Sequence, residues 1–155
     1  MADKKVFHVG DWATFSKTIS ESDVYAFAGV TGDFNGLFVN EEFARHTRYG
    51  KRIVPGNIPA SFISTAMGMS LPGPGAIFMD QSTKFVGPVF HNDTITATIQ
   101  LIEVREKGNY YICTIKGECR NQKGEIVIVS LCHEMASKDD VLILPREGDE
   151  EDDPD

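Results

Sequence analysis

The feature that most constrains this chain is the long apolar stretch from Gly56 to Ser70. Its large apolar residues recur at helical spacing, and most residues between them are small: Ile58, Phe62, Ile63, Ala66 and Met67 carry the pattern. A helix that is apolar nearly all round is a buried helix. Pro55 and Pro59 suit its beginning, and the Pro- and Gly-rich run 71–75 ends it. The rest of the chain must therefore provide a surface that covers this helix.

The sequence after the helix predicts four strands that can form such a surface. They are separated by turn residues and cover Ala76 to Val89 (interrupted near Gly87), Thr94 to about Val104, Tyr110 to Glu118 and Glu125 to Met135. Apolar and polar residues alternate with period two after Thr94, and the turns at 106–109 and 121–124 are typical of hairpins. Trp12 to Ile19 reads as an additional strand near the N-terminus. We therefore expect an antiparallel sheet of about five strands.

Two short helices are predicted before the long one. The first runs to about Val30 after the capping residues 20–23 and stops at Gly32, and the second covers Glu41 to about His46 with Asn40 as its cap. Asp33 to Val39 reads as a loop. Because helices and strands are segregated along the chain, the fold class is α+β. Such a sheet keeps its edges available, which favours a homodimer.

The net charge of −8 comes from one end of the chain. From Asp139 onward there are nine acidic residues and one basic residue, whereas residues 1–138 hold 14 of each sign and are neutral. A basic footprint for nucleic acid is therefore absent. We expect one domain over 1–138 and a flexible acidic tail over 139–155, which could also bind a partner. Within this tail, Val141 to Leu144 is apolar and either docks as an edge piece or is loose.

Cysteine usage and the N-terminus suggest a cytoplasmic address. Cys113, Cys119 and Cys132 are odd in number, lack a Cys-x-x-Cys spacing and fall in strand patterns, so we expect buried free thiols in a reducing compartment. Residues 1–5 lack the apolar run of a signal peptide. Because no stretch approaches the ~20 apolar residues that a spanning helix needs, we expect no membrane segment.

The best candidate for chemistry lies in the loop from Thr31 to Phe38. Asp33 and Asn35 place a carboxylate and a carboxamide two residues apart between glycines. A carboxylate in this setting can act as a general base, and a carboxamide can orient a water molecule. The same Asp-x-Asn pattern is also favourable turn chemistry, since both side chains can cap backbone donors. A catalytic and a purely structural role of Asp33 are both open at this stage.

Several blocks in order resemble the MaoC-like (R)-specific enoyl-CoA hydratases. These are Thr31-Gly32-Asp33-Phe34-Asn35, Ile53-Val54-Pro55-Gly56, Ala60-Ser61-Phe62-Ile63-Ser64, Leu71-Pro72-Gly73-Pro74-Gly75 and Gln81-Ser82-Thr83-Lys84-Phe85. The resemblance implies a hot-dog fold, in which an antiparallel sheet wraps a long helix, and a homodimer or dimer of dimers. It implies a site for acyl-CoA or acyl-carrier-protein thioesters near the subunit interface and a place in fatty acid metabolism. The family reaction is the reversible hydration of a trans-2-enoyl thioester to the (R)-3-hydroxyacyl thioester, without metal or redox cofactor.

The resemblance also implies a role for four residues. Asp33 is the catalytic base, the Gly56 N–H holds the thioester oxygen, and Asn35 and Ser64 help bind the substrate. Two family histidines are replaced. The motif Ser/Thr-Gly-Asp-x-Asn-Pro-Leu/Ile-His ends here in Phe38, and the histidine that is common before the helix glycine is Pro55. Since Phe38 cannot transfer a proton, an active enzyme would need another donor, and His46, His91 and His133 occupy no family site position.

Three functions are compatible with this pattern. The first is an (R)-specific enoyl-CoA hydratase or dehydratase with a relocated proton donor. The second is a non-catalytic module that binds acyl-CoA or acyl carrier protein, or a partner of an active paralogue, as the loss of both histidines suggests. The third is another lyase or a hydrolase on the same scaffold, because a fold does not fix a function.

Overall fold

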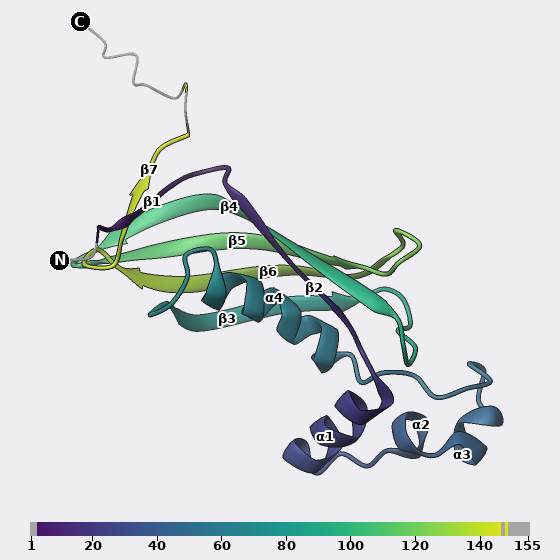
Figure 1. The fold of residues 1–155 in the computed structure, drawn as a ribbon. Helices are drawn as coiled ribbons and strands as arrows, with labels where there is room; N and C mark the ends of the chain where they lie inside the picture. Colours follow the sequence, from purple (N-terminus) through teal and green to yellow (C-terminus); the bar gives the residue numbers. More distant parts are fainter. Residues whose placement is uncertain (1–2, 147, 149–155) are drawn as a thin grey trace, which may run out of the picture.

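A computed structural model describes residues 3–146 and 148. Its largest element is a five-stranded antiparallel sheet in the order β2-β4-β5-β6-β3. The strands are β2 Trp12–Thr18, β3 Ile77–Phe85, β4 Thr94–Lys107, β5 Tyr110–Arg120 and β6 Ile126–Ser137. The helix α4, Asn57–Met69, lies along one face of this sheet (Figure 1). The predicted α+β class, the long helix and the five strands are therefore confirmed.

The core fills the space between α4 and the sheet. Ile63 and Met67 are fully buried and meet inward-facing residues of the central strands, such as Ile99 and Ile115. Phe62 contacts Phe15 of β2 edge to face, with ring centroids 5.3 Å apart. The expectation that α4 is buried all round is wrong for a single chain, because a strip with Asn57, Ser61 and Met69 stays exposed.

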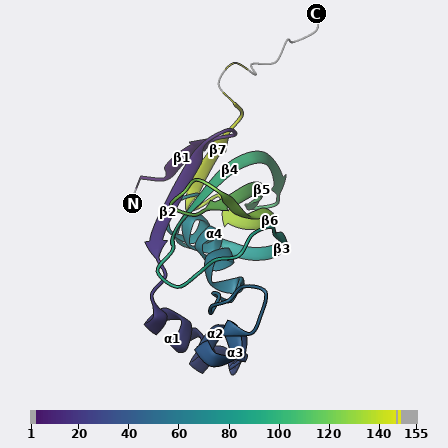
Figure 2. The same ribbon diagram turned by 90° about the vertical axis from the view of Figure 1, so that its right-hand side faces the viewer.

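Three short helices lie beyond the N-terminal end of α4, away from the sheet. They are α1 Glu21–Thr31, α2 Gly36–Val39 and α3 Glu41–Arg45 (Figures 1 and 2). Both predicted short helices are confirmed, as α1 and α3, with Asn40 capping α3. The predicted loop from Asp33 to Val39 is wrong in its second half, where α2 forms because the Asn35 side chain accepts a hydrogen bond from the Leu37 N–H.

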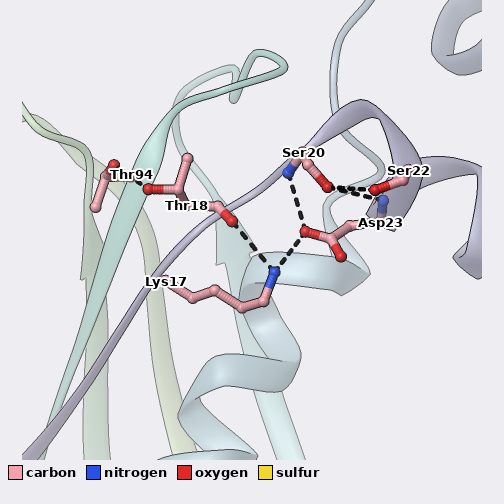
Figure 3. A network of polar contacts seen from close by, with 6 residues as sticks. All are labelled: Lys17, Thr18, Ser20, Ser22, Asp23 and Thr94. Carbon is pink, nitrogen blue, oxygen red and sulfur yellow. Dashed lines mark hydrogen bonds and ion pairs between the residues drawn. The ribbon is translucent and has the colours of Figure 1, made fainter.

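A capping box fixes the start of α1 against the end of β2. The Ser20 hydroxyl accepts from the Asp23 N–H, and the Asp23 carboxylate accepts from the Ser20 N–H (Figure 3). Lys17 of β2 pairs with the same carboxylate, and this pairing lowers the pKa of Asp23. Gly32 ends the helix in the left-handed conformation, φ 77°, as the sequence predicts. The loop that carries Asp33 therefore leaves α1 in a defined direction.

Two segments near the N- and C-termini form a second, parallel sheet. The sequence left the docking of residues 141–144 open and did not predict its partner strand. Strand β1, Lys5–His8, pairs with β7, Val141–Leu144, in register from Lys5 opposite Val141. Because Val141 and Ile143 belong to the core, the apolar segment docks on the domain and the folded part extends beyond Lys138. The predicted acidic tail otherwise lies largely outside the described residues.

The three cysteines are buried free thiols, as predicted. Burial raises the pKa of Cys113 and of Cys119 to about 12, so both stay protonated. Glu134 faces the same core and is 2% exposed.

No helix within residues 3–146 is long and apolar enough to cross a membrane.

Candidate active site

A relay of hydrogen bonds shapes the loop that carries Asp33. The Thr31 hydroxyl accepts from the Asp33 N–H at 3.2 Å, and Asp33 Oδ1 accepts from the Asn35 N–H at 3.1 Å. Asn35 Oδ1 in turn accepts from the Leu37 N–H at 3.0 Å. Both predicted site residues therefore have the structural role that their turn pattern favours. This role uses only one oxygen of Asp33, whose side chain is exposed.

Backbone contacts hold this loop against the start of α4. The Ile53 N–H donates to the Leu37 carbonyl at 3.1 Å, and the Val54 N–H donates to the Val89 carbonyl at 2.7 Å. Ile53 also forms an antiparallel bridge with Phe90. Three segments that are distant in the sequence thus meet where α4 begins: the α2 turn, the residues before the helix and the connection from β3 to β4.

A cavity of about 500 Å³ opens at this meeting point, and we call it the α4 cavity. Its lining is largely apolar, with Leu37, Phe38, Val54, Phe85, Val89 and Ile128 among its walls. Its volume falls in the range of small-molecule sites. Of the four predicted site residues, Gly56 lines this cavity, whereas Asp33, Asn35 and Ser64 are not part of its wall. The single chain therefore does not bring all four residues together.

The start of α4 presents two unused hydrogen-bond donors to the α4 cavity. Gly56 and Asn57 both line it, and their N–H groups donate to no acceptor within residues 3–146. Free N–H groups at a helix N-terminus carry partial positive charge, which attracts an oxyanion. The position of Gly56 also leaves little room for a side chain, because a Cβ there would lie 2.6 Å from the Phe85 ring. The geometry thus suits a carbonyl oxygen that gains negative charge during a reaction.

Ser64 lies in the second turn of α4 and is half-buried. Its neighbours Ser61 and Thr65 donate back to the helix, to the Ile58 and Ser61 carbonyls. The Ser64 hydroxyl has no such partner among the described residues. It belongs to the open side of α4, so it is available to a ligand or to a second chain that covers this side.

Two of the three histidines considered above as proton donors are engaged on the surface. His46 contacts Glu42 within α3, and His133 contacts Asp80 across β6 and β3. His91 differs, because both of its ring nitrogens are buried without a hydrogen-bond partner in the described part of the chain. Burial and the nearby Arg52 lower the pKa of His91, so the ring is neutral at physiological pH.

Sequence reasoning did not identify the polar residues at the mouth of the cavity. Arg48 and Tyr49 line the α4 cavity from the turn between α3 and α4. Phe85, at the end of β3, also lines the cavity. The signal for Arg48 and Tyr49 was the basic run 45–52 before α4, which contains no acidic residue.

Comparisons with known proteins identify relatives over most of the chain. A family model described as "MaoC like domain" matches residues 10–121. The (R)-specific enoyl-CoA hydratase of Rhodospirillum rubrum is 43% identical over 113 residues, which cover 70% of this chain and 78% of that protein. The mitochondrial 3-hydroxyacyl-(acyl-carrier-protein) dehydratase of Arabidopsis thaliana is 31% identical over 129 residues, which cover 83% of this chain and 76% of that protein.

A solved structure supports the same relationship. The (R)-hydratase from A. caviae involved in PHA biosynthesis superposes with a TM-score of 0.76 at 33% sequence identity. The match covers 81% of this chain and 94% of that chain. The predicted hot-dog architecture is therefore confirmed.

Proposed function

Because this chain belongs to the MaoC-like dehydratase family, we propose that it is an (R)-specific hydratase and dehydratase of acyl thioesters. Its substrate is a trans-2-enoyl thioester of CoA or of an acyl carrier protein, as the names of its relatives suggest. The observation that carries the proposal is the pair of free N–H groups of Gly56 and Asn57 at the α4 cavity. These donors suit the thioester oxygen, which becomes enolate-like during hydration.

The proposed reaction adds water across the carbon–carbon double bond. The free oxygen of Asp33 accepts a proton from a water molecule, and the water oxygen bonds to the β-carbon. The electron pair of the double bond moves toward the thioester carbonyl, whose oxygen is held by the N–H groups at Gly56 and Asn57. The protonated Asp33 then returns this proton to the α-carbon on the same face, which completes the addition and regenerates the carboxylate. Asn35 and Ser64 orient the water and the substrate. No metal or redox cofactor takes part.

Asp33 is exposed and is not part of the cavity wall in a single chain. We therefore propose that the site is completed in a homodimer. Strand β3 ends the sheet order and exposes Ile77, Met79 and Phe85, each about half accessible. An exposed apolar edge strand is a template for pairing with a second chain. The open strip of α4 with Ser64 provides a further surface that the partner can cover.

The test is hydration of crotonyl-CoA by the purified protein. The reaction is monitored as the loss of enoyl-thioester absorbance. Coupling the product to an (R)-specific 3-hydroxyacyl-CoA dehydrogenase reads its stereochemistry. We expect slow turnover with (R) product, since a general acid–base group contributes roughly 10²–10⁴-fold and the family histidine is Phe38. Absence of turnover over a series of acyl chain lengths would refute the proposal.

The second candidate is a non-catalytic module that binds acyl thioesters. It is favoured by Phe38, an apolar side chain that lines the α4 cavity where the family has histidine. This candidate predicts that butyryl-CoA or butyryl acyl carrier protein binds in calorimetry and that no enoyl thioester is hydrated. Turnover that depends on Asp33 would exclude it.

A further inference from the structure

The segment between α3 and α4 is positively charged, whereas residues 1–138 as a whole are neutral. Residues 45–52 include no acidic residue and four cations: Arg45, Arg48, Lys51 and Arg52. Arg45 is neutralised by Glu42, and Arg52 by Glu21, with N–O distances of 3.2 and 3.0 Å. The other two cations make no ion pair with any residue that the structure describes. Two positive charges therefore stay uncompensated: Arg48, which lines the α4 cavity, and Lys51, which follows it three residues later.

A tight turn fixes the first of these cations at the cavity. The Gly50 N–H donates to the Thr47 carbonyl at 3.0 Å, so Arg48 and Tyr49 occupy the two central positions of the turn. The Arg48 guanidinium lies 4.9 Å from the centroid of the Tyr49 ring and donates to its hydroxyl at 2.7 Å. Only part of the five N–H donors of a guanidinium is used by this contact. Arg48 thus presents both charge and free donors at the wall of the cavity.

The second cation is held in a similar way. The Lys51 ammonium lies 4.2 Å from the centroid of the Phe90 ring. The Phe90 backbone bridges Ile53, so this ring belongs to the framework that carries the start of α4. The Asp93 carboxylate near Phe90 accepts from the Phe90 N–H and the Gln122 amide. An aromatic ring positions a cation without neutralising it, so the charge of Lys51 stays available to an anion.

We propose that Arg48 and Lys51 bind a phosphate of the phosphopantetheine arm that carries the acyl group. This inference rests on the proposed function and extends it from the reacting end of the substrate to its carrier end. Gly56 and Arg48 line the same cavity, so one ligand can contact both. A guanidinium binds phosphate through two parallel hydrogen bonds, and an ammonium adds a point charge. CoA and acyl carrier protein share this phosphate chemistry.

The experiment compares three crotonyl thioesters: the CoA thioester, the acyl-carrier-protein thioester and the thioester of pantetheine, which lacks phosphate. The variant Arg48→Gln/Lys51→Gln removes both charges at similar side-chain length. The matched control is Arg105→Gln/Lys107→Gln, which removes two exposed charges from β4. Arg105 and Lys107 lie at the C-terminal end of β4. Its N-terminal residue, Thr94, pairs with Thr18 shortly before α1. The control changes the net charge equally but leaves the cavity unaltered.

We expect Arg48→Gln/Lys51→Gln to lower kcat/KM about tenfold or more for a phosphate-bearing thioester, mainly through KM. The pantetheine thioester and the control variant should stay within about twofold of the wild type, and added salt should reduce the difference. If kcat/KM falls only for the CoA thioester, the two side chains bind the phosphates of free CoA. If it falls only for the carrier-protein thioester, they bind the phosphate of the carrier's arm. An equal loss with the pantetheine thioester, or no loss beyond the control, would overturn the proposal.

Binding separates this inference from the proposed hydratase activity. If the wild type hydrates none of the three thioesters, the same variants are titrated by calorimetry with butyryl-CoA, butyryl acyl carrier protein and butyryl-pantetheine. Weaker binding of a phosphate-bearing ligand, with butyryl-pantetheine unaffected, then supports phosphate recognition even though the proposed reaction has failed. Unchanged binding of both butyryl-CoA and butyryl acyl carrier protein by Arg48→Gln/Lys51→Gln refutes phosphate recognition, whatever the activity.

Discussion

The Ile53 N–H donates a hydrogen bond of 3.1 Å to the Leu37 carbonyl and joins the Asp33 loop to the segment that starts α4. Asn35 caps α2 and so sets the position of Leu37. Asp33 on one side and the free N–H groups of Gly56 and Asn57 on the other are thereby linked through a few backbone contacts. Their relative position depends on turn chemistry, since few side chains of the loop are buried.

Asp33→Asn should separate the structural from the catalytic role of this residue. Asparagine keeps the Oδ1 acceptor for the Asn35 N–H, so the free energy of unfolding should change by less than about 1 kcal/mol. Hydration of crotonyl-CoA should fall by roughly 10²–10⁴-fold, because the base is lost. Asp11→Asn is the control, since Asp11 also accepts one backbone N–H in a turn, from His8. Full activity of Asp33→Asn would leave Asp33 with its turn role alone.

Phe38→His should restore the proton-transfer group of the family. Phe38 lines the α4 cavity, so an imidazole at this position can reach a bound thioester. We expect the hydration rate to rise by about 10²-fold or more. Phe34→His is the matched control, because Phe34 belongs to the same loop but is 63% exposed and outside the cavity wall. An equal gain from both variants, or a wild type that already turns over as fast as Phe38→His, would contradict this account.

The sequence predicted those elements whose signals are local. The period of two after Thr94, the capping box at Ser20 and the apolar run of α4 each specify their element directly. The β1–β7 pairing was missed because it joins two four-residue segments from opposite ends of the chain, neither of which has a distinctive period. The α2 helix was missed because four residues provide too little pattern, and the Asn35 cap decides the outcome.

The candidate site was predicted only in part for a similar reason. Asp33, Asn35 and Gly56 follow from a short motif, and the structure places them as turn, cap and helix start. The α4 cavity arises where residues 37–38, 48–49, 54–59 and 85–89 meet, and no local pattern encodes that meeting. Arg48 and Phe85 therefore emerged only with the structure.

Gly56→Ala should impair the α4 cavity. The added Cβ would lie 2.6 Å from two atoms of the Phe85 ring, so either this ring or the start of α4 with its amide donors must move. We expect kcat/KM for crotonyl-CoA to fall by about tenfold or more, since oxyanion donors act only at close range. Gly29→Ala is the control, because nothing lies within 4 Å of a Cβ there and alanine should stabilise α1 by ~0.5–1 kcal/mol. Unaltered kinetics of Gly56→Ala would show that this helix start does not hold the substrate.

Glu134 should make the stability of the fold depend on pH. Its carboxyl group is 2% exposed with Oε2 unpaired among the described residues, and burial raises its pKa from the ordinary 4.5 to about 7. The folded state therefore keeps a proton that the unfolded chain releases above pH 4.5. Its contribution to stability is complete below pH 4.5 and is lost as the pH rises toward 7. At ~1.4 kcal/mol per pKa unit, the loss amounts to at most about 3.5 kcal/mol.

Glu134→Gln tests this assignment, because glutamine is neutral at every pH. The free energy of unfolding, measured by urea titration between pH 4 and pH 8, should fall less with rising pH in Glu134→Gln than in the wild type. The variant should be the more stable protein at pH 8, and the two should converge near pH 4. Glu125→Gln is the control, since Glu125 is exposed in the turn before β6. Parallel pH profiles of wild type and Glu134→Gln would mean that the buried carboxyl group ionises in the folded state as readily as in the unfolded chain.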